Sequence, residues 1–83
     1  MEYNIEMGNV REDYNIYYKE GIRQLVVEVK LKHSYISKPT IIIVLNSLKK
    51  WDSNLSVTLD EFHRILVRVY TYAKNKKYDV FFE

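Results

Sequence analysis

The chain has 83 residues, of which 47% are hydrophobic and 29% charged, with a net charge of +2 and no cysteine. This length fits a single domain covering residues 1–83, and the composition is that of a folded protein. Without cysteine no disulfide can staple so small a chain, so its hydrophobic core has to suffice. The balanced charge does not by itself indicate nucleic-acid binding.

Membrane insertion and export are not expected from the sequence. The longest apolar run, Ile41–Leu45, is far too short to span a bilayer. The N-terminal segment lacks the basic region and the apolar region of a signal peptide. Together with the absence of cysteine, these features favour a cytoplasmic protein.

Alternation of apolar and polar residues predicts strands over much of the first half of the chain. Glu2–Met7 and Tyr14–Lys19 alternate in this way, and Ile22–His33 is the clearest case. Gly8–Asn9 is a turn signal after the first strand. Glu20–Gly21 offers a tight turn that would join the next two strands into a hairpin.

The β-branched run Ile41–Leu45 follows the only proline and predicts a central strand covered on both faces. A buried helix start is the alternative, because Asn46–Trp51 could continue a helical period. With the strand favoured, Asn46–Val57 becomes a polar connection. Tyr78–Glu83 alternates again and predicts a closing strand.

Thr58–Lys77 has the marks of a complete amphipathic helix. Thr58 and Glu61 stand at the spacing of a capping box. Asp60 and Arg64 are four residues apart and are expected to form a solvated pair on the helix surface. The apolar stripe consists of Leu59, Phe62, Ile65, Leu66, Val69, Tyr70 and Ala73.

These elements predict an α+β fold. We expect an antiparallel or mixed sheet of about five strands, in the chain order β-β-β-β-α-β, with one long helix (58–77) packed across one face.

The sequence contains no constellation of residues suited to catalysis. His33 and His63 are the only histidines, and neither stands in a pattern with a nucleophile and an orienting group. Clustered metal ligands and a glycine-rich phosphate loop are also missing from the sequence. We therefore expect a protein without enzymatic activity, catalytic residues, metal or cofactor.

Two kinds of binding function remain. Lysines near aromatic residues, which suit single-stranded nucleic acid, occur at Lys30, Lys32, Lys49 and Lys50, with Tyr35 among them. Acidic residues interrupt these clusters, so a solvated positive edge is the competing interpretation. Surplus aromatic residues off the predicted core faces, such as Tyr17, Tyr35 and Trp51, suit a protein interface, with packing in a wide core as the competing interpretation.

The second half of the chain also carries a pattern of specific residues. They are Ser47, Lys50, Trp51 and Asp52, then Thr58, Glu61 and Ile65 of the helix, and the closing strand Tyr78–Glu83. This pattern resembles a family of small immunity proteins from bacterial polymorphic-toxin and contact-dependent growth inhibition systems. The resemblance covers residues 47–83.

The resemblance implies an inhibitor without chemistry of its own, which binds and neutralises one cognate protein partner, a toxin or nuclease domain. The contacts expected for it are Lys50, Trp51, Asp52, Tyr17 and Tyr35. The alternatives are a phage or viral inhibitor of a host defence protein, and a single-stranded nucleic-acid-binding protein that uses Lys30, Lys32, Tyr35, Lys49 and Lys50. A homodimer joined through an edge strand is a further possibility.

Overall fold

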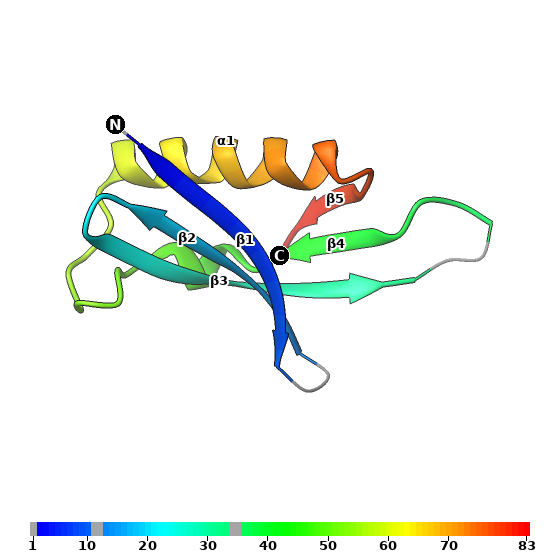
Figure 1. Cartoon of the computed structure of the whole chain (residues 1–83), viewed down its shortest axis with the longest axis horizontal. Helices are drawn as coiled ribbons and strands as arrows, with labels where there is room; N and C mark the ends of the chain where they lie inside the picture. Colours follow the sequence, from blue (N-terminus) through cyan, green and yellow to red (C-terminus); the bar gives the residue numbers. More distant parts are fainter. Residues whose placement is uncertain (1, 11–12, 34–35) are drawn as a thin grey trace.

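The computed structural model of the chain describes residues 2–10, 13–33 and 36–83. Within these residues the chain forms a five-stranded sheet and one α-helix, which confirms the predicted α+β fold and the order of its elements (Figure 1). The strands are β1 (Tyr3–Val10), β2 (Asp13–Glu20), β3 (Arg23–Lys32), β4 (Thr40–Ile43) and β5 (Asp79–Phe82). The helix α1 spans Leu59–Asn75, and a short 3₁₀ helix, η1, spans Leu45–Leu48.

The sheet is mixed, with its strands in the order β1-β2-β3-β4-β5. Strands β1 to β4 pair with one another in antiparallel, whereas β5 pairs with β4 in parallel. A parallel neighbour requires a crossover connection, and α1 supplies it by running across one face of the sheet. As a result β1 and β5 are the two edge strands.

The core lies between α1 and the face of the sheet that it covers. Strand residues directly opposite one another, such as Ile16 with Val27 and Tyr18 with Leu25, point to this face and are buried. From the helix, Ile65, Val69 and Ala73 fill the other side. Among the described residues, the buried apolar side chains are Ile16, Tyr18, Leu25, Val27, Val29, Ile41, Ile43, Leu48, Trp51, Ile65, Val69 and Ala73.

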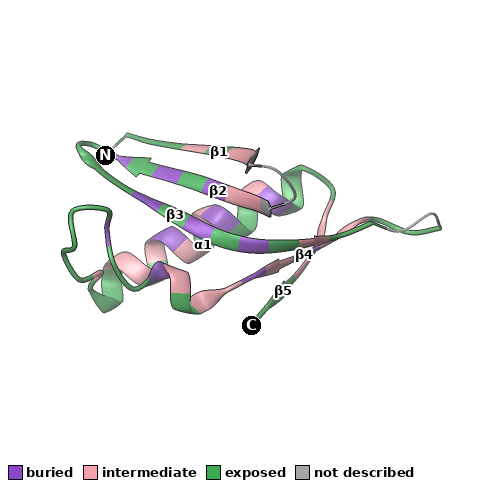
Figure 2. Cartoon of the chain, turned by 90° about the horizontal axis from the view of Figure 1, so that it is seen from below, coloured by how far each residue is buried: buried purple, intermediate pink, exposed green. Residues whose placement is uncertain are grey.

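The other face of the sheet is open, as the alternating purple and green along β2 and β3 in Figure 2 show. This corrects the prediction that the isoleucine run is covered on both faces. In β4 only Ile41 and Ile43 are buried, while Ile42 between them is partly exposed. The strand also ends at Ile43, because Leu45 begins the 3₁₀ helix η1.

Gly8 lies within β1 and is not part of a turn, which corrects the interpretation of Gly8–Asn9. Both residues pair with β2, opposite Asn15 and Tyr14. A Cβ atom on Gly8 would come within 2.8 Å of the Tyr17 ring. The glycine therefore makes room for a tyrosine that lies across the neighbouring strand on the open face.

The predicted capping box of α1 is confirmed. The Glu61 backbone N–H donates to Thr58 Oγ1 over 3.2 Å, and the Thr58 backbone N–H donates to Glu61 Oε1 over 2.9 Å. The helix ends at Asn75, two residues before its predicted end at Lys77. Lys77 takes a positive φ of 71°, which breaks the helical repeat. No helix among the described residues is long and apolar enough to cross a membrane.

Candidate protein-binding surface

Trp51 belongs to the core, and the expectation that it contacts a partner is corrected. Its side chain is only 2% exposed, and its ring lies 6.3 Å from that of Tyr18 between centroids. Two backbone hydrogen bonds hold it there: Trp51 N–H donates to Leu55 O, and Asp52 N–H donates to Gln24 O at the start of β3. The distinctive Lys-Trp-Asp segment thus anchors the long connection to the sheet.

Ser47 has a similar structural role in this connection. Its hydroxyl accepts a hydrogen bond from the Glu28 backbone N–H over 2.9 Å and donates to Val44 O over 2.6 Å. The expected polar connection 46–57 therefore contributes to the core through Leu48 and Trp51, and it is tied along β3 at two points. Packing and backbone hydrogen bonds account for Ser47, Leu48 and Trp51 without a partner.

Of the other residues predicted to contact a partner, Tyr17 and Asp52 lie together on the surface, and Lys50 lies elsewhere. Tyr17 is 38% exposed and lines a depression on the open face of the sheet together with Asp52 and Val26. Lys50 lines a different hollow beside the start of α1. Tyr35 lies outside the described residues.

The lysines proposed to bind nucleic acid do not form one patch. Lys30 Nζ lies 2.9 Å from both carboxylate oxygens of Glu83, and Lys32 follows at the end of β3. Lys49 and Lys50 belong to the connection that runs beside β3 between its ties at Glu28 and Gln24, whereas Lys30 lies further along the strand. This arrangement does not favour a continuous track for a nucleic-acid backbone.

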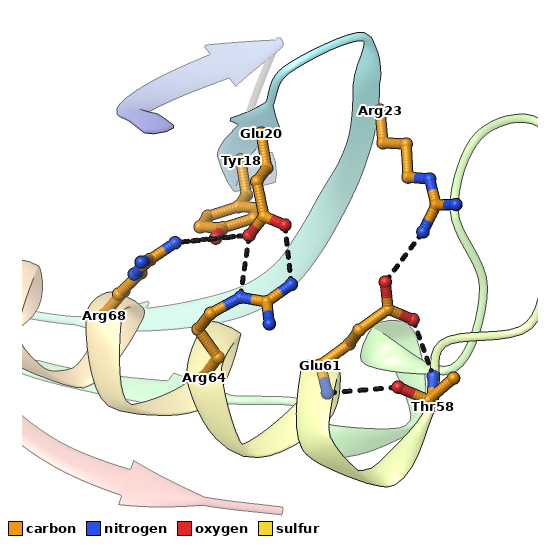
Figure 3. A network of polar contacts seen from close by, with 7 residues as sticks. All are labelled: Tyr18, Glu20, Arg23, Thr58, Glu61, Arg64 and Arg68. Carbon is orange, nitrogen blue, oxygen red and sulfur yellow. Dashed lines mark hydrogen bonds and ion pairs between the residues drawn. The ribbon is translucent and has the colours of Figure 1, made fainter. Parts of the chain in front are cut away.

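The structure brings together a polar cluster that the sequence analysis did not identify (Figure 3). Glu20, at the end of β2, is only 4% exposed. Its carboxylate accepts hydrogen bonds from Arg64 Nε and Nη2 over 3.0 and 2.6 Å, from the Tyr18 hydroxyl over 2.6 Å and from Arg68 Nη1 over 3.2 Å. Arg64, expected to pair with Asp60 on the helix surface, thus binds the sheet.

The protonation of this cluster follows from its contacts. Burial alone would raise the pKa of Glu20, but hydrogen bonds from Arg64 and Tyr18 and the charges of Arg64 and Arg68 outweigh it, so the pKa is lowered. Burial raises the pKa of the Tyr18 hydroxyl, and its hydrogen bond to Glu20 adds to the effect. At neutral pH the cluster is an ionised carboxylate held by two arginines and a neutral tyrosine.

This cluster joins one flank of α1 to the sheet. Arg64, Arg68 and Tyr72 stand four residues apart and form a row on the helix. Arg64 and Arg68 bind Glu20. The Arg68 guanidinium also lies 4.0 Å from the centroid of the Tyr3 ring, and the Tyr72 hydroxyl accepts a hydrogen bond from the Met7 backbone N–H. The flank of α1 that faces β1 and β2 is therefore occupied by contacts within the chain.

At the first turn of α1, Glu61 extends this set of contacts. The Arg23 guanidinium lies 2.8 Å from Glu61 Oε2, which ties β3 to the capping box. The backbone N–H of Thr58 is the main cause of a lowered Glu61 pKa. A weak interaction of the Trp51 indole N–H with this carboxylate also lowers the pKa, although the indole N–H makes no hydrogen bond of normal geometry to any described residue.

The opposite flank of α1 is apolar and open. Leu59, placed on the buried stripe from the sequence, is 72% exposed, and Tyr70 is 40% exposed. Phe62 and Leu66, between them on this flank, are only partly buried. The Tyr70 ring stacks on Phe82 of β5 with 6.2 Å between the ring centroids, so the apolar flank continues onto the edge of the sheet.

We call these side chains, together with the free edge of β5, the β5 surface. Its side chains are Leu59, Phe62, Leu66, Tyr70 and Phe82. At one end it opens into a groove whose apolar walls come from Leu45, Leu48, Val57, Leu59 and Phe62 and whose charged residues are Lys49 and Lys50. The arrangement presents a long apolar strip beside an edge strand, with two cations at one end.

Compared with known protein families, curated protein sequences and solved structures, the chain shows no match. Among the described residues there is also no group of three or more histidines and carboxylates that could hold a metal ion. The physical features of the β5 surface are therefore the basis for assigning a function.

Proposed function

We propose that this protein binds one cognate protein partner through the β5 surface and acts by occupying it, without chemistry of its own. The observation that carries the proposal is the difference between the two flanks of α1. One flank is held by Glu20, Tyr3 and Met7, whereas the other leaves Leu59 and Tyr70 exposed beside an edge strand. Contiguous apolar patches of this kind mark interaction sites in soluble proteins.

The kind of partner is proposed from the resemblance of residues 47–83 to small immunity proteins. Such a protein would neutralise a toxin or nuclease domain by covering the surface that domain uses. Aromatic and aliphatic side chains at the centre of a patch, with charges at its rim, are the usual composition of such interfaces. Tyr70, Phe82 and Leu66 would form the centre, and Lys49 and Lys50 the rim.

The test is an affinity purification from the native host with tagged protein, run with and without nuclease treatment, followed by mass spectrometry. We expect one stoichiometric protein that survives nuclease and whose purified activity the wild-type chain inhibits. Leu59→Asp should abolish both binding and inhibition, because it places a charge on the exposed apolar flank. Ile22→Asp is the matched control, since Ile22 is fully exposed in the β2–β3 turn.

Two results would overturn the proposal. Material that is captured only while nucleic acid is intact would indicate a nucleic-acid-binding protein. Equal binding by wild type and Leu59→Asp would place the interface elsewhere on the molecule.

A further inference from the structure

The edge of β5 has free backbone hydrogen-bonding groups. The N–H groups of Asp79 and Glu83 donate to Pro39 O and Ile43 O, and Leu45 N–H donates to Glu83 O, so alternate residues of β5 face β4. Successive residues of a strand direct these groups to opposite edges. The N–H and C=O groups of Val80 and Phe82 therefore point away from β4, and none of the described strands lies on that side (Figure 2).

An added strand at this edge would meet the apolar flank of α1. Neighbouring strands lie about 4.8 Å apart, and their side chains alternate between the two faces. Every second side chain of the added strand would point to the helix-covered face, where Leu66, Tyr70 and Phe82 are available. These three side chains favour apolar residues at alternate positions of the incoming segment.

The two lysines at one end of the β5 surface favour acidic residues at the corresponding end of the added strand. At the end of β5, the Leu45 backbone N–H donates to Glu83 O. Leu45 also lines the groove that contains Lys49 and Lys50. None of the described residues that line this groove is acidic. A segment that runs along β5 and ends in carboxylates would neutralise the two lysines there.

A second copy of the chain fits this edge poorly. Two-fold pairing that overlaps residues 79–83 of both copies places Asp79 directly opposite Glu83 of the other copy, twice. Like charges directly opposite one another destabilise a strand pair. The lysines of the groove would also stay without acidic partners, because β5 has no carboxylate on its helix-covered side.

We propose that the β5 surface receives an extended segment of a partner protein as an additional antiparallel or parallel strand. The segment alternates apolar residues toward α1 and carries Asp or Glu at the end beside Lys49 and Lys50. This inference rests on the proposed function and specifies its mode of recognition. Main-chain hydrogen bonds to Val80 and Phe82 provide the register, and the apolar strip and the lysines provide selectivity.

The first experiment is selection of a phage-displayed library of random ten-residue peptides against the folded chain. We expect enriched peptides with apolar residues at every second position and carboxylates near one terminus. For the best of them as a synthetic peptide, N-methylation at alternate positions should weaken binding by at least about tenfold, and methylation at the positions between should not. Failure of the library to enrich, or insensitivity to N-methylation, would overturn the proposal.

Variants of the protein test the same contact from the other side. Phe82→Pro removes the outward N–H of an edge residue, while Phe82→Ala removes only the ring and serves as the matched control. Peptide binding should fall at least about tenfold further in Phe82→Pro than in Phe82→Ala, with thermal unfolding showing that both variants fold. The double variant Lys49→Glu, Lys50→Glu should lose the preference for carboxylates.

The peptide selection contains no cognate partner, so it tests the docking mode independently of the function. If the purified partner binds Phe82→Pro as tightly as Phe82→Ala, the strand-addition mode is wrong and the inhibitor function stands. If the chain in solution is a dimer that Phe82→Pro dissociates, a second copy occupies the edge and this inference is wrong. Mass measurement by light scattering distinguishes that case.

Discussion

Glu20→Gln is the most informative single test of how this fold is held together. Glu20 is 4% exposed, and its two carboxylate oxygens accept four hydrogen bonds, three of them from arginines. Glutamine keeps the shape of the side chain and removes its charge. It also replaces one acceptor oxygen by an amide N–H₂ group. In place of Oε1 this group removes the acceptor of Arg64 Nη2, and in place of Oε2 it removes the acceptor shared by Tyr18, Arg64 Nε and Arg68.

The expected cost follows from the burial of each partner. Removing one member of a fully buried ion pair costs about 3–5 kcal/mol. Here the side chains of Arg64 and Arg68 are 35% and 22% exposed, so water can partly solvate them after the charge is lost. We therefore expect a loss of about 2–3 kcal/mol in the free energy of unfolding, or roughly 10–20 °C in Tm for a domain of this size.

Urea and thermal unfolding at pH 7, followed by circular dichroism, measure this change. Glu28→Gln is the matched control, because Glu28 carries the same chemical group on the open face of the same sheet and is exposed. We expect the control to unfold like wild type. A loss below about 0.5 kcal/mol for Glu20→Gln would refute the reasoning, since that is the size of an ordinary surface substitution.

The pH dependence gives a second, independent readout of the same cluster. The folded-state pKa of Glu20 is below its ordinary value of 4.5, so its contribution to stability is present above that value and is lost as the pH falls toward the folded-state pKa. The difference between wild type and Glu20→Gln should be constant above about pH 6 and shrink below pH 4.5. A difference that persists unchanged into this acid range would contradict the assignment.

Substitutions at three further positions, Trp51, Thr58 and Gly8, test the packing and the helix cap. Trp51→Ala should cost about 3–5 kcal/mol in urea unfolding, whereas Trp51→Phe should cost clearly less, because the buried indole N–H makes no hydrogen bond to any described residue. Thr58→Ala should cost about 1 kcal/mol through loss of the cap, with Thr58→Ser close to wild type. Gly8→Ala should destabilise by about 1 kcal/mol, but should stabilise the chain in a Tyr17→Ala background, where the ring that a Cβ would meet at 2.8 Å is gone. Equal costs for the two Trp51 variants would contradict the first prediction, and equal costs for the two Thr58 variants would contradict the second. The third would be contradicted if Gly8→Ala destabilised the chain in the Tyr17→Ala background as well.

Features set by near neighbours in the sequence could be predicted. The capping box of α1 depends on Thr58 and Glu61, three residues apart, and the β2–β3 hairpin depends on alternation around Gly21. Such patterns are decided by backbone geometry within a few residues, so the chain order of the elements follows from them. Gly8 misled the prediction because a glycine signals a turn as well as a close approach.

Other features could not be predicted, because they depend on contacts between distant residues. The bond between Glu20 and Arg64 spans 44 residues, and its partners cannot be recognised until α1 lies over β2. Trp51 stands in a polar stretch, and only the ties of that stretch to β3 place its ring in the core. Burial of a side chain depends on what the rest of the chain places beside it.

The β5 surface likewise combines features that the sequence predicts with features that only the tertiary structure decides. The sequence by itself determined that α1 is amphipathic and that a strand follows it, since both are periodic patterns of side chains. It did not determine that β5 would be an edge strand parallel to β4, or that the flank of α1 with Leu59 and Tyr70 would stay uncovered beside it. Strand order and helix rotation are settled by packing the whole core at once, and they decide which apolar residues remain available for a partner.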